Sequence, residues 1–200
     1  MNTVCVLTGD LIDSQRYQTE QYIEALRRIL NDLEKMGKIV RYEIYRGDEF
    51  QITAVPEWGI RCALYLRAAL KAQHSEWDAK ISVAFGSETE QDGSYGTAYL
   101  NSGEKLDNLS ANKRMQFAVE EQEFAVLADT MDFIINGWSQ TTARAVMTRL
   151  VTRTGKEAAE RLGVSPANVS RALKRGGYEV LLGLAGFIYE VGGLDDHPAS

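Results

Sequence analysis

Residues 39–55, IVRYEIYRGDEFQITAV, decide the fold of this chain. Apolar and polar residues alternate from Ile39 to Tyr45, and they alternate again from Glu49 to Val55. Arg46-Gly47-Asp48 between the two stretches is a turn sequence. The pattern predicts two strands joined in a β-hairpin.

Further strands and helices are predicted on both sides of this hairpin. The strand patterns cover residues 3–8, 79–85 and 115–119, and the helical patterns cover residues 18–36, 56–72, 97–109 and 121–135. Gly9 and Gly86 are expected to end the strands that precede them. The order β-α-β-β-α-β-α-β-α predicts an α+β domain, a ferredoxin-like palm with additions and with the hairpin at its centre.

A polar stretch at residues 136–140 separates this sheet domain from an all-α segment. Helices are predicted there at about 141–152, 155–162, 166–175 and 178–191. We therefore expect a palm domain over residues 1–137, a DNA-binding module over residues 138–194 and a disordered tail over residues 195–200.

Charge is distributed unevenly along the chain. The net charge is −6, yet residues 138–190 hold eight Lys and Arg against four Glu. An acidic body followed by a basic segment predicts two separate tasks, with nucleic acid as a partner of the second.

The composition also indicates the compartment and excludes one class of metal site. Cys5 and Cys62 lie among apolar residues and are expected to be buried free thiols in a cytoplasmic protein. The sequence has no apolar run of membrane-spanning length and no signal peptide, so no membrane partner is expected. His74 and His197 lack metal-ligand spacing, which argues against zinc.

The most specific motif is residues 155–174, GKEAAERLGVSPANVSRALK. Apolar residues at helical spacing predict two helices, Gly163 permits the turn between them, and Ser165-Pro166 begins the second helix. The segment resembles the helix-turn-helix of bacterial transcription regulators. That resemblance implies that the second helix enters the major groove of DNA.

The outward residues of the second helix are the expected DNA contacts. Asn168 and Arg171 have the hydrogen-bonding groups that read adenine and guanine, and Ser170 lies beside them. Lys174 and Arg175 are expected to contact phosphates. The alternative is an ordinary helical hairpin whose basic face is merely solvated.

Two Gly-Asp pairs carry the second signal. Asp10 ends the first predicted strand and Asp48 lies in the hairpin turn, so both carboxylates are expected at one sheet edge if the strands are neighbours. With Glu49 and the backbone carbonyl of Leu11 they form an oxygen-rich site suited to Mg²⁺ or Mn²⁺. The alternative reading is that Gly-Asp is simply favourable turn chemistry.

Three motifs together resemble the bacterial SatD family. They are Gly9 to Ser14, Arg46 to Gln51, and Gly96 to Asp107, and the resemblance covers most of the chain. The middle motif is also similar to the signature of diguanylate cyclases, and the layout is similar to class III nucleotidyl cyclases.

The cyclase resemblance assigns roles to several of these residues. It implies metal binding by Asp10 and Asp48, and a transition-state role for Asn101 and Lys105 if the protein is an active cyclase. A nucleotide is expected at Arg46, Gly47 and Lys105. Two departures favour binding over turnover: only one glycine precedes Asp48, and Lys105 replaces an arginine and so lacks the planar fork that grips phosphate.

Three functions follow. The first is a DNA-binding regulator whose cyclase-like domain binds a divalent metal and a nucleotide. The second is an active metal-dependent nucleotidyl cyclase or nucleotidyltransferase, and the third is a dimerisation scaffold without nucleotide binding. The expected partners are DNA through residues 155–175, a nucleotide at the palm domain, and a second copy of the chain, because helix 178–191 is apolar nearly all round.

Overall fold

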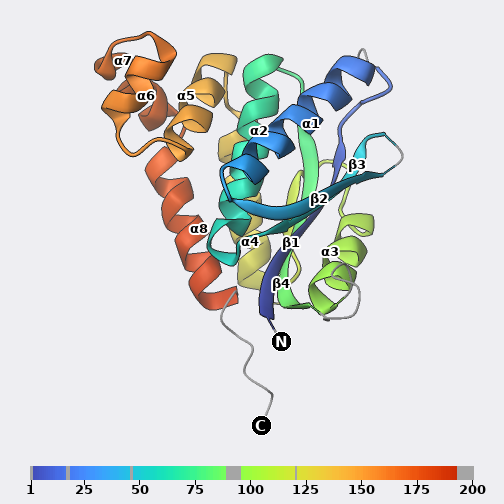
Figure 1. The fold of residues 1–200 in the computed structure, drawn as a ribbon. Coiled ribbons are helices and arrows are strands. Elements are labelled where there is room, and N and C mark those ends of the chain that lie inside the picture. Colours follow the sequence, from blue (N-terminus) through green and yellow to red (C-terminus); the bar gives the residue numbers. More distant parts are fainter. Residues whose placement is uncertain (1, 17–18, 46, 89–95, 120, 193–200) are drawn as a thin grey trace.

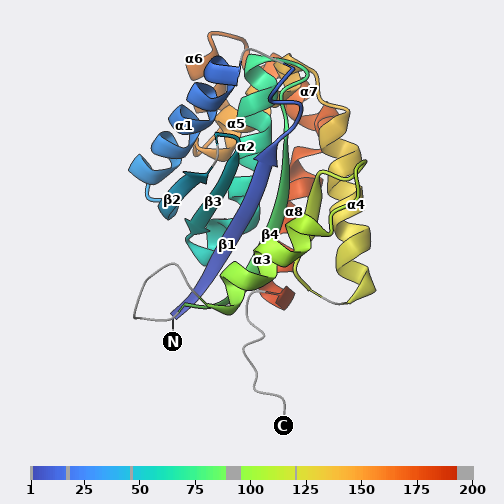
Figure 2. The same cartoon turned by 90° about the vertical axis from the view of Figure 1, so that its right-hand side faces the viewer.

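A computed structural model describes residues 2–16, 19–45, 47–88, 96–119 and 121–192. Its centre is a five-stranded mixed sheet with helices on both faces (Figures 1 and 2). The predicted order of strands and helices is confirmed, and the chain is a mixed α/β protein. Arg46 and the tail at 195–200 lie outside the described residues.

The strands are β1 (Asn2–Leu11), β2 (Ile39–Tyr45), β3 (Glu49–Ala54), β4 (Ala79–Glu88) and β5 (Met115–Phe117), arranged in the order β2-β3-β1-β4-β5. Neighbouring strands are antiparallel except β4 and β5, which are parallel. The predicted hairpin, β2–β3, is present, but it forms one side of the sheet and β1 is the central strand. The expectation of a hairpin at the centre is therefore wrong.

Strand β1 does not end at Gly9. It continues to Leu11, and Gly9 pairs with Phe50 of β3. A Cβ atom added to Gly9 would lie 2.3 Å from the Phe50 ring, so the glycine is required for close packing rather than for a turn. Asp10 is consequently held inside the sheet, with a neighbour on each side. Strand β4 likewise continues past Gly86.

The two faces of the sheet are covered differently. Helices α1 (Thr19–Lys35) and α2 (Gly59–Gln73) pack on the face that carries Leu7, and the short 3-10 helix η1 (Pro56–Trp58) leads into α2. Helix α3 (Thr97–Asp107) packs on the opposite face, against Val4 and Val6 of β1. Because side chains alternate along β1, Thr8 and Asp10 lie on the α3 face.

The remaining helices are α4 (Gln122–Asn136), α5 (Gln140–Leu150), α6 (Gly155–Leu162), α7 (Pro166–Arg175) and α8 (Tyr178–Gly192). Val146 of α5 and Leu181 of α8 belong to the same buried cluster as the core of the sheet domain. The hydrophobic core therefore runs across the predicted boundary at 136–140. None of the helices in the described ranges has the length and apolar run needed to cross a bilayer.

A buried ion network connects α2, the start of β4 and the end of α4. Arg67, which is fully buried, donates to both carboxylate oxygens of Asp78 at 2.8 and 2.9 Å, and it also pairs with Asp132. Asn136 accepts a further bond at 3.0 Å, and the Lys71 ammonium lies 3.2 Å from Asp78. Burial alone would raise the pKa of Asp78, but Arg67 and Lys71 outweigh it and hold that pKa below its usual range.

Candidate functional site

Helices α5, α6 and α7 form a three-helix unit at one end of the molecule (Figure 1). Its small centre is built from Ala158, Ala159 and Val169. Gly163, with φ of +65°, ends α6, and the Ser165 hydroxyl accepts the Asn168 N–H at 3.3 Å to begin α7. The bounds of α6 and α7 are those predicted from the sequence.

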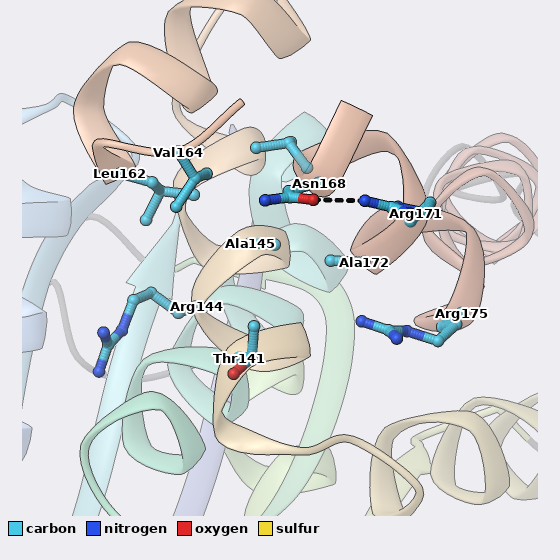
Figure 3. A pocket seen from close by; sticks show the side chains of 10 residues that line it. Thr141, Arg144, Ala145, Leu162, Val164, Asn168, Arg171, Ala172 and Arg175 are labelled. Carbon is cyan, nitrogen blue, oxygen red and sulfur yellow. Dashed lines mark hydrogen bonds between the residues drawn. The ribbon is translucent and has the colours of Figure 1, made fainter. Parts of the chain in front are cut away.

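Helix α7 turns almost all of its polar residues toward solvent. It buries Val169 and Ala172, while the five predicted DNA contacts are exposed: Asn168, Ser170, Arg171, Lys174 and Arg175. Arg171 Nη2 donates to Asn168 Oδ1 at 2.5 Å, so these two side chains lie together on the open face (Figure 3).

A groove of about 350 Å³ separates α7 from α5. Arg144 of α5 and Arg171 and Arg175 of α7 line it, together with Thr141 and Leu162 (Figure 3). Arg144 was not predicted as a DNA contact, because the helix-turn-helix motif begins eleven residues later, at Gly155. Only the excess of basic residues in this part of the chain pointed to it.

A second groove, of about 590 Å³, lies on the other side of α7. Its lining includes Arg149, Lys156, Ser170 and Lys174. Helix α7 therefore stands between two grooves that both carry basic side chains.

The acidic site lies at one end of the central strands. In the sheet register Asp10 of β1 has Glu49 of β3 on one side and Lys80 of β4 on the other. Register partners in antiparallel strands share a face, so these side chains are neighbours on the α3 face. All three line a cavity of about 290 Å³.

Asp48 lies at the same end of the sheet. The Leu11 N–H donates to the Asp48 carbonyl oxygen at 3.2 Å, and the Ser14 hydroxyl donates to the Asp48 carboxylate at 2.5 Å. Asp10 and the turn residue Asp48 therefore lie at the same end of the sheet, as predicted. Gly47, with φ of +89°, lies in the adjoining turn.

The electrostatics of this site centre on Asp10. Burial, the Asp48 carboxylate and the Glu49 carboxylate raise the pKa of Asp10 to about 6, and Lys80 opposes them only in part. The three carboxylates therefore repel one another in the absence of a cation, and a divalent ion bound between them would relieve that repulsion.

The donor set fits a hard cation in its chemistry, since it offers carboxylate oxygens. Within the described ranges, however, no group of three or more His, Cys, Asp or Glu residues lies close enough to hold a metal ion. The Asp48 carboxylate is engaged by Ser14 instead. The site of Asp10, Asp48, Glu49 and the Leu11 carbonyl stays a prediction, and the Asp48 carboxylate can keep its bond from Ser14 while another of its lone pairs binds a metal ion.

Two predicted residues of α3 do not line this cavity. The helix contributes Gly103, Leu106 and Asp107 to the lining, whereas Asn101 is exposed and Lys105 is half-buried outside the lining. The cation beside Asp10 is Lys80, which sequence reasoning missed. Its signal was a lysine in the otherwise apolar strand AKISVAF, two positions from Ser82 and therefore on the same face.

No family model matches this sequence, and no curated protein sequence matches it. The SatD and cyclase resemblances therefore rest on the three motifs alone.

Proposed function

We propose that this protein is a DNA-binding regulator that reads the major groove with α7. The observation that carries the proposal is the open face of α7, where Asn168 and Arg171 line one basic groove and Ser170 and Lys174 line a second. An α-helix with its side chains is about 10–12 Å across and fits a major groove about 12 Å wide, and at ten residues α7 is about 15 Å long.

The arrangement of charge supports this proposal over a solvated helical hairpin. In the part of the chain that the structure describes, no carboxylate pairs with Arg144, Arg171 or Arg175. Arg171 and Arg175 lie on the same helix without acidic partners among the described residues, whereas Arg144 donates to the Ala72 carbonyl at 3.5 Å, and a phosphate backbone compensates basic side chains of this kind. Arg171 and Asn168 then read bases, while Ser170, Lys174, Arg175 and the newly found Arg144 position the helix on phosphates.

For the sheet domain we propose a sensor that binds Mg²⁺ or Mn²⁺ together with a nucleotide. The β-α-β-β-α-β order and the strand order β2-β3-β1-β4 support a ferredoxin-like palm. The raised pKa of Asp10 supports a cation as the missing partner of its carboxylate. Lys80, at the same cavity, supplies a positive charge for a phosphate group.

The enzyme alternative receives less support from the geometry. A transition-state role requires Asn101 and Lys105 at the reacting phosphate, and neither lines the cavity that holds Asp10. Incubating the protein with Mn²⁺ and each nucleoside triphosphate separates the alternatives. Binding without new products supports the sensor, new cyclic products support the cyclase, and no binding supports the scaffold.

The DNA proposal is tested by selecting bound fragments from a genomic library and titrating them by anisotropy. We expect sequence-dependent binding that weakens steeply with salt. The proposal fails if no fragment is retained even at low salt.

A further inference from the structure

Exposed apolar side chains gather on two helices, α4 and α8. Nine large hydrophobic residues are exposed in the described part of the chain, and five of them lie on these helices: Val126, Phe133, Val180, Phe187 and Val191. Phe133 is 83% exposed. Scattered apolar residues need no explanation, but a concentration of this kind marks a surface that is covered by a partner.

The two helices run side by side in opposite directions (Figures 1 and 2). Gly177, just before α8, lies against Ile134 near the end of α4, and Gly192 at the end of α8 lies against Phe124 near the start of α4. Each helix turns its buried residues toward the core, so the residues on the outer sides form two adjacent stripes. We call the two stripes together the α4–α8 face. Its residues are Val126, Thr130, Phe133, Val180, Leu184, Phe187 and Val191.

The stripe on α8 has the spacing of a helix that packs on another helix. Val180, Leu184, Phe187 and Val191 follow one another at intervals of four, three and four residues, the a and d positions of a heptad. Gly183 is exposed beside this stripe, and no atom lies within 4 Å of where its Cβ would be. A glycine inside a helix costs about 0.5–1 kcal/mol relative to alanine, and here it leaves room for a second helix to approach.

The charge of the surface decides between possible occupants. Neither α4 nor α8 contains a lysine or an arginine, and both carry glutamates, Glu123 on α4 and Glu179 and Glu190 on α8. Nucleic acid and anionic membranes require basic side chains at their binding surface. An apolar centre without basic side chains instead fits an apolar protein surface, and in a dimer the glutamates would lie at the solvated rim.

We propose that the α4–α8 face is a two-fold interface between two copies of this chain, with α8 crossing α8 of the second copy near Gly183. Two adjacent 15-residue helices, each about 22 Å long and about 10 Å wide, give a footprint of about 440 Å², roughly half of the 800 Å² per partner of a standard interface and typical of a weak dimer. A two-fold contact needs only one self-complementary surface.

This interface would also fix the relation between two recognition helices. Helix α8 follows α7 after the pair Gly176-Gly177, so the interface lies next to the helix-turn-helix in the chain. A dimer formed there presents two copies of α7 to two half-sites. The dimer itself does not depend on DNA binding, and it is tested without DNA.

The test compares the parent chain with four variants by light scattering at about tens of micromolar, a range in which interfaces of this size associate. We expect a dimeric parent. Phe133→Glu and Phe187→Glu place a charge in the apolar centre and should raise the dimer dissociation constant at least about tenfold. Leu100→Glu is the matched control, because Leu100 is 54% exposed on α3, and this variant should stay dimeric.

Gly183→Leu keeps the test decisive if a charged variant fails to fold. The space around Gly183 is open in one copy of the chain, so this variant should keep its circular dichroism and its thermal midpoint while losing the dimer. A monomeric parent overturns the proposal, and so does a dimer that persists in Phe187→Glu and Gly183→Leu. Binding of a monomeric parent to phosphatidylcholine–phosphatidylserine vesicles would overturn it in favour of a membrane surface.

Discussion

The indole Nε1 of Trp138 donates a hydrogen bond of 2.9 Å to the backbone carbonyl of Gly176. Trp138 follows α4 and is 5% exposed, and Gly176 is the residue that ends α7. One buried bond thus joins the junction after the sheet domain to the end of the recognition helix.

Trp138→Phe keeps an aromatic ring and removes this bond. The free energy of unfolding is expected to fall by about 1–3 kcal/mol, because the Gly176 carbonyl is left buried without its donor. Trp77→Phe is the matched control, since Trp77 stacks on Tyr22 and its Nε1 has no hydrogen-bond partner among the described residues. Urea titrations that show equal losses for the two variants would contradict this account.

Replacing Arg67 is expected to cost far more than replacing an exposed arginine. Arg67→Met removes the arginine from the buried carboxylates of Asp78, which keeps Lys71, and Asp132, which keeps two backbone donors, and the loss of such a buried pair costs about 3–5 kcal/mol. The loss should be smaller in acid, where protonation neutralises the stranded carboxylates. Arg28→Met on α1, where Arg28 is exposed, serves as the control in urea unfolding at two pH values. If Arg67→Met loses no more free energy of unfolding than the control, the buried ion network does not stabilise the fold.

The contribution of Asp10 to the free energy of unfolding of the metal-free protein should fall as pH rises from about 4 to about 6. The pKa of Asp10 is raised to about 6 in the folded state, so the native protein binds more protons than the unfolded chain in this interval. Below the pKa of Asp10 in the unfolded chain, protonated Asp10 contributes its full stabilisation. That stabilisation is lost as the pH rises through the pKa of Asp10 in the folded protein. Because Asp10 is only half-buried, screening reduces the effect to about 1 kcal/mol.

Asp10→Asn should remove this dependence and raise the thermal midpoint at pH 8 in the presence of a chelator. Glu20→Gln, at an exposed position on α1, is the control and should leave the dependence intact. Parental stability that rises between pH 4 and pH 6, with no change in Asp10→Asn, would show that the carboxylates do not repel one another.

Calorimetry of nucleotide binding distinguishes the two lysines. Mg²⁺ or Mn²⁺ is expected to strengthen triphosphate binding, and Asp48→Asn should abolish that gain while leaving the fold intact, because asparagine suits a turn. Lys80→Met should weaken binding, since Lys80 lines the cavity with Asp10, whereas Lys105→Met should not. The reverse ranking of the two lysine variants would restore the role that the cyclase resemblance gave to Lys105.

Local signals predicted the helix-turn-helix well and the sheet less well. The bounds of α6 and α7 depend on a cap and a glycine turn within ten residues of each other, so the sequence nearby contains the information. The sequence around the end of β1 does not contain the information that sets where this strand ends. Gly9 reads as a strand breaker, and only Phe50, distant in sequence and opposite in the sheet, explains why the strand continues.

The candidate acidic site was predicted in part for a similar reason. The placement of Asp10 and Asp48 depended on the condition that the first strand and the hairpin are neighbours, and the pairing of β1 with β3 meets that condition. The side of α3 that faces the sheet depends on how the helix is rotated against β1 and β4. The spacing of Asn101 and Lys105 in the motif does not reveal this rotation. Arg67 was missed because no local pattern marks a buried arginine whose partners lie on β4 and α4.

The most direct measurement of the central claim is a salt-dependent anisotropy titration of selected DNA with the parent, Arg171→Ala and Lys174→Ala, with Arg28→Ala as the control. Arg171→Ala should weaken binding to the selected site by about 1–3 kcal/mol and reduce discrimination against unrelated sequence. Lys174→Ala should weaken all sequences alike and lower the salt slope by about one, and Arg28→Ala should change neither. If the four proteins bind DNA equally, or if the parent binds none at low salt, α7 is not a recognition helix.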